Sequence, residues 1–298
     1  MPRFLASDLR CAGGDHPRTA ACGYQVAWTI NPHMIVGSVD RARALDQHAR
    51  LLRTVRALGA EVVCLPFVHG GFDSVFVKDN ALYLRRRDRD RAVLGAPRFE
   101  VRRLEQRSRG RDLGRAGFEV DDRSPAFEGG DLCVLPGGGA FLGHGFRSSP
   151  AAIEHLARIL GGPVTPLELV DPELYHLDTA LAALADGTVL ACEAAFSAAS
   201  RETLRRTARG EVISIARDEA VRFALNLVEV GDTIVTGTDS AVVAAALRAR
   251  GKRVIVTPLD EFHRAGGSVA CLRAPIHDLD AQSTVAISAT AAMRSTAA

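Results

Sequence analysis

The sequence lacks the long apolar run that a membrane-spanning helix requires, since no such run reaches about 18 residues. It also lacks the basic segment followed by an apolar stretch that marks a secretory leader. We therefore expect a soluble, cytoplasmic protein that does not enter a membrane.

Neither sign of charge is in excess. There are 37 basic and 35 acidic residues, which leaves a net charge of +2. This balance gives no reason to expect nucleic acid or an acidic membrane surface as a partner. Lysine is scarce, because only Lys78 and Lys252 occur and the other basic residues are arginines. We attribute this preference to genome composition and not to function.

Cysteine is present, but without the spacing of a metal site. No pair has CxxC spacing, and no Cys/His group has the spacing of zinc ligands. A chain of 298 residues does not need disulfides for stability. We expect reduced thiols, several of them buried, and neither a metal nor a cofactor. The six cysteines are Cys11, Cys22, Cys64, Cys133, Cys192 and Cys271.

Strands, hairpins and single helices alternate along the chain. The helices are expected at 40–59, 150–160, 198–208, 218–223 and 239–250. The strands are expected at 24–30, 61–66, 75–83, 131–135, 140–143, 179–184, 188–192, 211–215, 253–257 and 284–288. Turn signals at Asp186-Gly187 and Gly231-Asp232 predict hairpins at 179–192 and 229–235.

A unit of strands, helix and strand recurs about five times, at intervals of roughly 50–60 residues. The sequence shows no linker and no break in composition. We therefore predict one catalytic α/β domain over residues 23–280, with strand ends that converge on a central site. Residues 1–22 are interpreted as an irregular lead, and residues 281–298 as a last strand and tail.

Twelve arginines lie between residues 84 and 115, interleaved with acidic residues. The simplest interpretation is a solvated helix with exposed ion pairs. One or two of these arginines reaching a substrate carboxylate is the alternative.

A candidate nucleophile, Cys271, lies in a short apolar run that follows Gly266-Gly267. A thiol becomes nucleophilic when a nearby cation or hydrogen-bond donor favours the thiolate. The two glycines allow the backbone to turn tightly and approach a ligand. Taken alone, an isolated cysteine is usually just a small buried residue.

Three earlier stretches offer a base and carboxylates. His176 and Asp178 would face the same side if they lie on a strand, although a polar strand end facing water explains them too. Glu128 and Asp131 flank a glycine pair, as in an acidic turn. Asp73 and Asp79 bracket Ser-Val-Phe-Val-Lys and share one face of the expected strand, and an edge strand would account for them equally.

Together, these four stretches resemble the guanidine-modifying superfamily of arginine deiminases, arginine dihydrolases, dimethylargininases and amidinotransferases. The resemblance covers most of residues 24–276 and follows the order Asp, Glu, His, Cys. It rests on Phe72-Asp73-Ser74-Val75-Phe76-Val77-Lys78-Asp79, Glu128-Gly129-Gly130-Asp131, His176-Leu177-Asp178-Thr179 and Gly266-Gly267-Ser268-Val269-Ala270-Cys271. It implies the pentein fold, a five-bladed α/β propeller, and no metal.

The resemblance also implies roles. Cys271 attacks the guanidinium carbon, His176 donates and then accepts a proton, and Glu128 orients and charges the histidine. Asp79 and Asp178 accept hydrogen bonds from the guanidinium nitrogens. The remaining substrate-contacting candidates are Phe72 as an apolar wall, Asp73, Asp131, and Arg147 or Arg98 as the partner of a substrate carboxylate.

The residue two positions after the histidine separates members of this superfamily. Asp178 resembles those that act on unmethylated guanidines, whereas dimethylargininases usually lack an aspartate there. Asn31-Pro32 and Tyr175-His176-Leu177-Asp178-Thr179 also resemble the arginine dihydrolases, which have an asparagine in place of Asp79. The expected substrate is arginine or an arginine-like small molecule, hydrolysed with release of ammonia. An amidinotransferase, a dimethylargininase and a silent binding homologue are alternatives, and a homodimer is left open.

Overall fold

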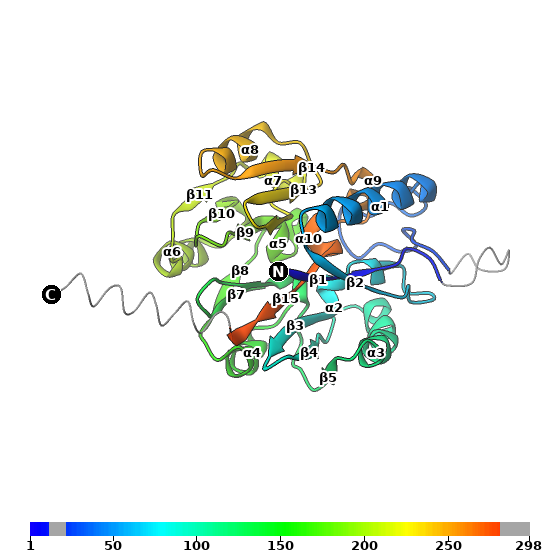
Figure 1. The fold of residues 1–298 in the computed structure, drawn as a ribbon. Coiled ribbons are helices and arrows are strands. Elements are labelled where there is room, and N and C mark those ends of the chain that lie inside the picture. Colours follow the sequence, from blue (N-terminus) through cyan, green and yellow to red (C-terminus); the bar gives the residue numbers. More distant parts are fainter. Residues whose placement is uncertain (12–21, 281–298) are drawn as a thin grey trace.

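The computed structural model describes residues 1–11 and 22–280, and within them one arrangement of elements recurs (Figure 1). Two antiparallel strands are followed by a helix and by a third strand that lies parallel to the second. Five such units are present in the described part of the chain. This is the α/β architecture that the resemblance implies.

Four of the units are continuous in sequence. The first contains β3 (Ala81–Arg86), β4 (Arg89–Leu94), α3 (Glu100–Arg115) and β5 (Glu119–Asp121). The second contains β6 (Leu132–Val134), β7 (Ala140–His144), α4 (Ile153–Leu160) and β8 (Val164–Glu168). The third contains β9 (Leu181–Ala183), β10 (Val189–Ala191), α6 (Ala198–Thr207) and β11 (Val212–Ser214). The fourth contains β12 (Leu227–Val230), β13 (Thr233–Thr236), α8 (Ala241–Arg248) and β14 (Arg253–Val256).

The fifth unit joins the two ends of the described chain. It contains β15 (Ala274–Asp278), β1 (Arg3–Ser7), α1 (Arg41–Ala57) and β2 (Glu61–Leu65). β15 also pairs in parallel with β3, so the fifth and first units share a six-stranded sheet in the order β2-β1-β15-β3-β4-β5. The central place of β1 corrects the expectation of an irregular lead for residues 3–7, whereas residues 12–21 of that lead lie outside the described residues.

The outer helices cover the sheets with apolar side chains. Each contributes a leucine that is 0–1% exposed, and such a burial stabilises the fold by about 1.5–3 kcal/mol. These leucines are Leu51, Leu113, Leu156, Leu204 and Leu247. The apolar layer therefore lies between the helices and the strands and leaves the strand ends free to carry polar groups.

Short helices stand immediately before the first strands of the units, and they supply most of the site. In chain order they are η1 (Phe72–Val75), α2 (Val77–Asn80), η2 (Gly129–Asp131), η4 (Pro172–Leu174), α5 (Leu177–Ala180), α7 (Arg217–Val221), α9 (Asp260–His263) and α10 (Val269–Leu272). Two more short helices, η3 (Pro150–Ala152) and η5 (Glu193–Ala195), follow β7 and β10.

These short helices overturn two expectations. The strand expected at 75–83 is η1 and α2 followed by β3, and His176 is the N-cap of α5 and not a strand residue. The shared strand face proposed for Asp73 and Asp79, and for His176 and Asp178, is therefore wrong. The chain turns because its polar groups are satisfied locally, as when the Val68 N–H donates to Ser74 Oγ at 3.3 Å.

Other elements match the sequence more closely. The helices at 40–59, 198–208 and 239–250 are confirmed, as are the hairpins β9–β10 and β12–β13. The strand expected at 24–30 is wrong, because the structure has no strand there and the segment bends at Trp28 and Ile30. The strand expected at 284–288 lies outside the described residues. Within the described ranges, no helix combines the length and apolar character needed to cross a membrane.

Candidate active site

Cys271, His176 and Glu128 come from three different units and lie together in the interior, each no more than 2% exposed. Cys271 lies on α10, His176 caps α5, and Glu128 immediately precedes η2. The three share this centre because each directly precedes the first strand of its unit. The structure thus brings together the three catalytic candidates that the sequence suggested.

The glycines before Cys271 permit close packing. Gly266 has a φ of +86°, and a Cβ there would meet the Tyr175 hydroxyl at 2.7 Å. A Cβ on Gly267 would lie 2.4 Å from the ring of Phe76. The tight turn expected at this pair is present, and the groups that approach it are protein side chains that line the site.

His176 is held in its charged form by carboxylates. Its Nε2 lies 3.0 Å from Glu128 Oε2, and its Nδ1 lies 3.7 Å from Asp79 Oδ1. Burial alone would lower the pKa of His176, but Asp79, Asp131 and Glu128 outweigh it and raise the pKa to about 9. An imidazolium at neutral pH is suited to protonate a departing amine.

Glu128 is stabilised as an anion although no water reaches it. Burial would raise its pKa, but the Arg147 guanidinium at 3.1 Å and the His176 ring hold that pKa well below its usual range. The N–H of Arg98 also donates to Glu128 Oε1 at 3.3 Å. Glu128 therefore keeps its charge and can both orient and charge the histidine.

The thiol of Cys271 is protonated in this environment. Burial is the main cause that raises its pKa well above the usual value, and the carboxylates of Asp178 and Asp79 add to it. Asp178 Oδ2 lies 3.6 Å from Sγ. A guanidinium placed beside these carboxylates would cancel their effect and favour the thiolate, so arrival of a cation would activate the nucleophile.

Asp79 offers an acceptor for such a cation. Its Oδ2 accepts from Arg102 at 3.3 Å, whereas its Oδ1 is buried and accepts no hydrogen bond within the described chain. Burial, together with the charges of Glu128 and Asp178, raises the pKa of Asp79. A buried carboxylate oxygen without a donor is costly, and a planar N–H donor would satisfy it.

Asp79, His176 and Cys271 line the same enclosed cavity, which measures about 10 Å³. That is room for about one water molecule. Tyr175 and Met34 are among the side chains that close it. A guanidine carrying an alkyl chain is larger, so its entry requires the covering side chains to move.

Asn226 is a site residue that the sequence analysis missed. Its Nδ2 donates to Cys271 Sγ at 3.2 Å, and its Oδ1 accepts from the N–H groups of Ala270 and Cys271 at 2.9 and 3.3 Å. It precedes β12, the position equivalent to those of the other site residues. Only this equivalence between units could have indicated it, because no motif surrounds it.

We expect Asn226→Ala to lower kcat by about 10- to 100-fold, because the sulfur loses a donor that stabilises its anion. The orphaned N–H groups would also cost about 1–3 kcal/mol of unfolding free energy. Steady-state kinetics and thermal melts measure both effects. Ser200→Ala is a matched control, because Ser200 Oγ accepts from the Glu168 N–H far from the thiol, and kcat should not change. Equal kcat losses in the two variants would contradict a role for Asn226 at the sulfur.

Arg102 and Arg109 correct the interpretation of the arginine-rich helix. They are 3% and 0% exposed, and they lie on the buried side of α3. Arg102 forms ion pairs with Asp79 and Glu105, whereas Arg109 donates to the Ser74 carbonyl at 2.8 Å. The spacing of 102, 105, 106, 109 and 113 is helical, and it was the available sign of a buried face.

Two carboxylates proposed to bind substrate are instead used by the protein. Asp131 accepts from Ser148 Oγ at 2.6 Å and from the Leu177 N–H at 3.1 Å, which fixes the chain next to His176. Burial raises the pKa of Asp131 to about 7. Asp73 accepts from Trp28 Nε1 at 2.7 Å. In this structure both aspartates therefore hold neighbouring groups of the protein in place.

Phe72, Arg147 and Arg98, the apolar and basic candidates for substrate contact, also have other partners in this structure. Phe72 packs on Trp28, and Phe76 lines the cavity in its place. Arg147 lines the cavity, but its nitrogens donate to Glu128 and to the Ile30 carbonyl. The Arg98 side chain is exposed and donates to the Phe146 carbonyl. In this structure neither arginine presents a free guanidinium to the cavity.

Asp79, Glu128 and His176 place three potential metal-ligand atoms within 4.8 Å of one another. Both carboxylates already have a cationic partner, Arg102 for Asp79 and Arg147 for Glu128. Such pairing neutralises the charge that would attract a metal ion. The set is better suited to proton transfer than to metal binding.

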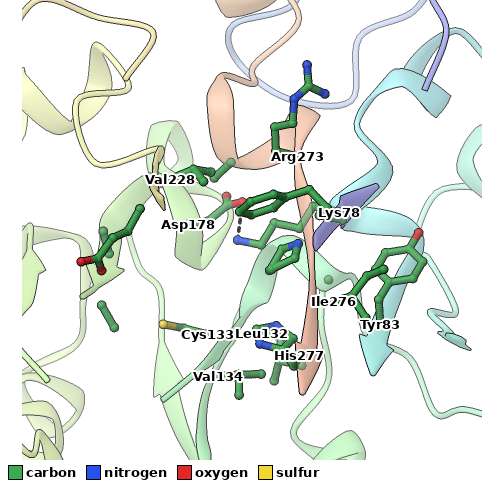
Figure 2. Close-up of a pocket in the computed structure, with 18 of the residues that line it drawn as sticks. Lys78, Tyr83, Leu132, Cys133, Val134, Asp178, Val228, Arg273, Ile276 and His277 are labelled. Carbon is green, nitrogen blue, oxygen red and sulfur yellow. Dashed lines mark hydrogen bonds and ion pairs between the residues drawn. The ribbon is translucent and has the colours of Figure 1, made fainter. Parts of the chain in front are cut away.

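Lys78 forms an ion pair with Asp178 at 2.9 Å, beside a second cavity of about 320 Å³ (Figure 2). Burial opposes the charge of Lys78, but Asp178 outweighs it and raises the lysine pKa. Cys133 and His277 line this cavity as well. The role of Lys78 is thus to neutralise a carboxylate that touches the thiol.

Removing the positive charge of Lys78 should lower both the stability and the activity of the protein. We expect Lys78→Met to lose about 3 kcal/mol of unfolding free energy and to lower kcat, because a buried, unpaired Asp178 would disfavour the thiolate further. Denaturant unfolding and kinetics test this. Lys252→Met is the matched control, since Lys252 has the same side-chain exposure but pairs with Glu229 and not with the carboxylate beside the thiol. Adding Asp178→Asn should restore stability to Lys78→Met, and failure to do so would refute the pairing.

Comparison with known proteins finds one family profile, described as N,N-dimethylarginine dimethylhydrolase, eukaryotic, over residues 33–278. A dimethylarginine dimethylaminohydrolase of Mycobacterium tuberculosis is 34% identical over 85% of this chain and 83% of its own. The bifunctional arginine dihydrolase/ornithine cyclodeaminase AgrE of Nostoc is 32% identical over 84% of this chain and 36% of its own.

Solved structures of arginine dihydrolases are also similar to this chain. Two structures of the N-terminal domain of ArgZ, a cyanobacterial arginine dihydrolase, match with a TM-score of 0.83 and 28% identity over 94% of this chain and 99–100% of theirs. One is a mutant bound to substrate, and the other is covalently bound to a reaction intermediate.

Proposed function

The chain belongs to the N,N-dimethylarginine dimethylhydrolase family, within the guanidine-modifying superfamily, and on that premise we propose that it hydrolyses a C–N bond in the guanidinium group of arginine through a covalent intermediate on Cys271. The observation that carries the proposal is a buried oxygen of Asp79 that accepts no hydrogen bond from the described residues. It lies 3.7 Å from the charged His176 ring and lines the same cavity as Cys271. A guanidinium N–H is the donor that fits this oxygen.

The first half of the reaction forms the intermediate. The substrate cation lies against Asp79 and Asp178 and lowers the thiol pKa, so that the thiol proton passes to solvent while His176 keeps its own proton. Sγ attacks the guanidinium carbon and forms a C–S bond. The C–N bond to one terminal nitrogen then breaks, and His176 gives that nitrogen a proton, so ammonia leaves.

The second half releases the product. A water molecule takes the place of the ammonia, and His176 accepts a proton from it as the oxygen attacks the same carbon. The C–S bond breaks, the thiol regains its proton, and a ureido product departs. The proposal is consistent with the covalent intermediate described for ArgZ.

The position of Asp178 supports the proposal of an unmethylated substrate. A carboxylate beside the reacting carbon accepts a hydrogen bond from an N–H, and a dimethylated nitrogen has none. Dimethylarginine is the second candidate, favoured by the family profile and by the mycobacterial relative. The pairing of Asp178 with Lys78 gives this candidate a physical basis, since it occupies one of the two carboxylate oxygens.

Product analysis tests the proposal. The purified protein is incubated separately with arginine, monomethylarginine, dimethylarginine and agmatine, and products are identified by mass spectrometry. Citrulline with one ammonia from arginine alone is the expected result. Ornithine with two ammonia would indicate dihydrolase chemistry, and citrulline only from methylated substrates would overturn the role of Asp178. Transfer of the amidino group to glycine or lysine would replace hydrolysis with an amidinotransferase.

A further inference from the structure

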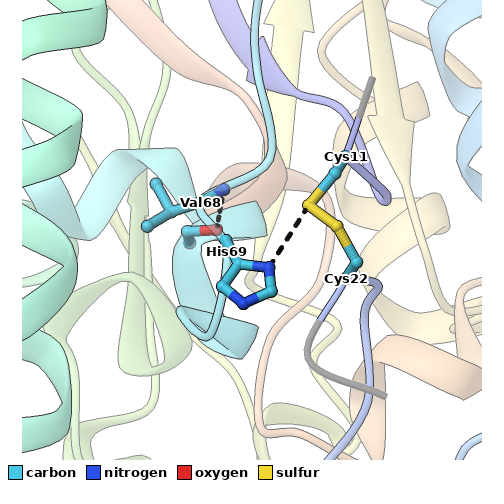
Figure 3. Close-up of a disulfide and its surroundings, with 5 residues drawn as sticks. Cys11, Cys22, Val68 and His69 are labelled. Carbon is cyan, nitrogen blue, oxygen red and sulfur yellow. Dashed lines mark hydrogen bonds between the residues drawn. A yellow bond between two sulfur atoms is a disulfide. The ribbon is translucent and has the colours of Figure 1, made fainter. Parts of the chain in front are cut away.

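Cys11, Cys22 and His69 come together at the surface (Figure 3). Cys11 follows β1, Cys22 precedes the segment that contains Trp28, and His69 lies in the loop after β2. The two cysteines form a disulfide with a Cα–Cα distance of 5.3 Å, and His69 Nδ1 lies 3.9 Å from Cys11 Sγ. This disulfide corrects the expectation that every thiol is reduced.

The three donor atoms lie within 4.8 Å of one another. Two thiolates and an imidazole are ligands that zinc prefers over magnesium or calcium. Zinc bonds of about 2.3 Å to sulfur and 2.0–2.1 Å to nitrogen place a sulfur ligand and a nitrogen ligand about 3.6 Å apart in a tetrahedral site. The observed separation of 3.9 Å between Cys11 Sγ and His69 Nδ1 is close to that distance.

We propose that the reduced Cys11–Cys22 pair and His69 form a zinc site with a water molecule in the fourth position. A dithiol gives two electrons and two protons to the Cys11–Cys22 bond and is itself oxidised to a disulfide. Each thiol then loses its proton as its sulfur binds the ion. The sulfurs separate from about 2 Å in the disulfide to about 3.8 Å around the metal, by rotation about the Cα–Cβ bonds.

The exposure of Cys11, Cys22 and His69 allows a metal ion to enter and leave the site. Cys11 and Cys22 are half-buried and His69 is exposed, so a hydrated ion reaches all three without unfolding of the core. The second three-ligand set, Asp79, Glu128 and His176, is fully buried and already neutralised by arginines. The two sets therefore differ in both access and charge.

The metal would join segments that position the substrate pocket. His69 lies four residues before Asp73, and Trp28, six residues after Cys22, donates to Asp73 at 2.7 Å. Binding to the folded state alone stabilises it in proportion to the logarithm of ion concentration. We therefore expect the melting temperature of the reduced protein to rise with added zinc. The site is independent of the reaction proposed above.

Cobalt is the direct probe, because its absorption reports the ligands without any substitution. The protein is treated with a phosphine reductant, transferred to anaerobic buffer and titrated with Co²⁺, then with Zn²⁺ against a chromogenic chelator. We expect one equivalent of tetrahedral Co²⁺ with thiolate charge-transfer bands, displaced by one equivalent of Zn²⁺. The oxidised protein should show none of these bands.

Variants identify the ligands. Cys11→Ser and Cys22→Ser should each weaken zinc binding more than tenfold, and His69→Ala should weaken it measurably. Cys64→Ser, which removes another exposed thiol, should bind as the parent does. Absence of thiolate bands from the reduced parent would overturn the proposal. So would binding that survives Cys11→Ser and is lost in Cys271→Ser, because the ion would then occupy the active site.

Discussion

Cys271→Ala is expected to abolish turnover of every guanidine substrate, with kcat reduced by a factor on the order of 10⁴ or more. Among the described residues that line the enclosed cavity, Cys271 alone carries a thiol that can form the C–S bond of the proposed intermediate. The two carboxylates that we propose receive the guanidinium, Asp79 and Asp178, are unchanged in this variant. Substrate binding should therefore persist and be detectable by calorimetry while product formation stops.

Cys192→Ala is the control for this variant, since Cys192 is also a fully buried free cysteine, but it lies next to β10 in the apolar core. Its loss should lower stability modestly and leave kcat unchanged. Turnover by Cys271→Ala within tenfold of the parent would remove Cys271 from the role of nucleophile. A loss of substrate affinity without a loss of kcat would point to a binding role.

Glu128→Gln is expected to lower kcat by about 10²- to 10³-fold and to shift its pH profile. His176 donates its proton only while charged, so activity should fall as pH rises through its pKa of about 9. Removing the Glu128 charge removes one of the groups that raise this pKa. The alkaline limb of the variant should therefore lie at lower pH than that of the parent.

Glu261→Gln provides the comparison, because Glu261 is 1% exposed and accepts from the Asp40 N–H at 2.8 Å outside the site. Both variants lose a buried carboxylate, but only Glu128→Gln should move the alkaline limb. Profiles of kcat from pH 6 to 10.5, with melts at each pH, separate the chemical effect from unfolding. An unshifted limb in Glu128→Gln would show that Glu128 does not charge His176.

The candidate site was predictable mainly through its motifs. Cys271, His176, Glu128, Asp79 and Asp178 all lie in one centre, as the four stretches indicated. Strand periodicity correctly indicated Asp79 and Asp178, but the strands it assumed at these positions are absent. Short helices, and not strands, carry them, because a helical turn before each first strand directs polar groups toward the centre while the strands keep their apolar faces.

Functional residues that lie outside a sequence motif could not be identified from the sequence. Asn226 stands in a loop between α7 and β12, and only the repeat of the fold equates it with the other site positions. Cys11, Cys22 and His69 have no metal-binding spacing. The parallel pairing of β1 with β2 and the bridge between Arg10 and Gly23 bring them together. Burial of Arg102 depended on which side of α3 faces Asp79. These are tertiary contacts that no single segment encodes.

The central claim is that the guanidine carbon becomes bonded to Cys271 during turnover. Enzyme mixed with arginine is quenched in acid within milliseconds to seconds, and the intact protein and its peptides are weighed. We predict an amidino adduct on the Cys271 peptide that appears before citrulline and decays as substrate is consumed, and that is absent from Cys271→Ala. Citrulline formed at full rate with no adduct at any time, or an adduct on another cysteine, would contradict the account.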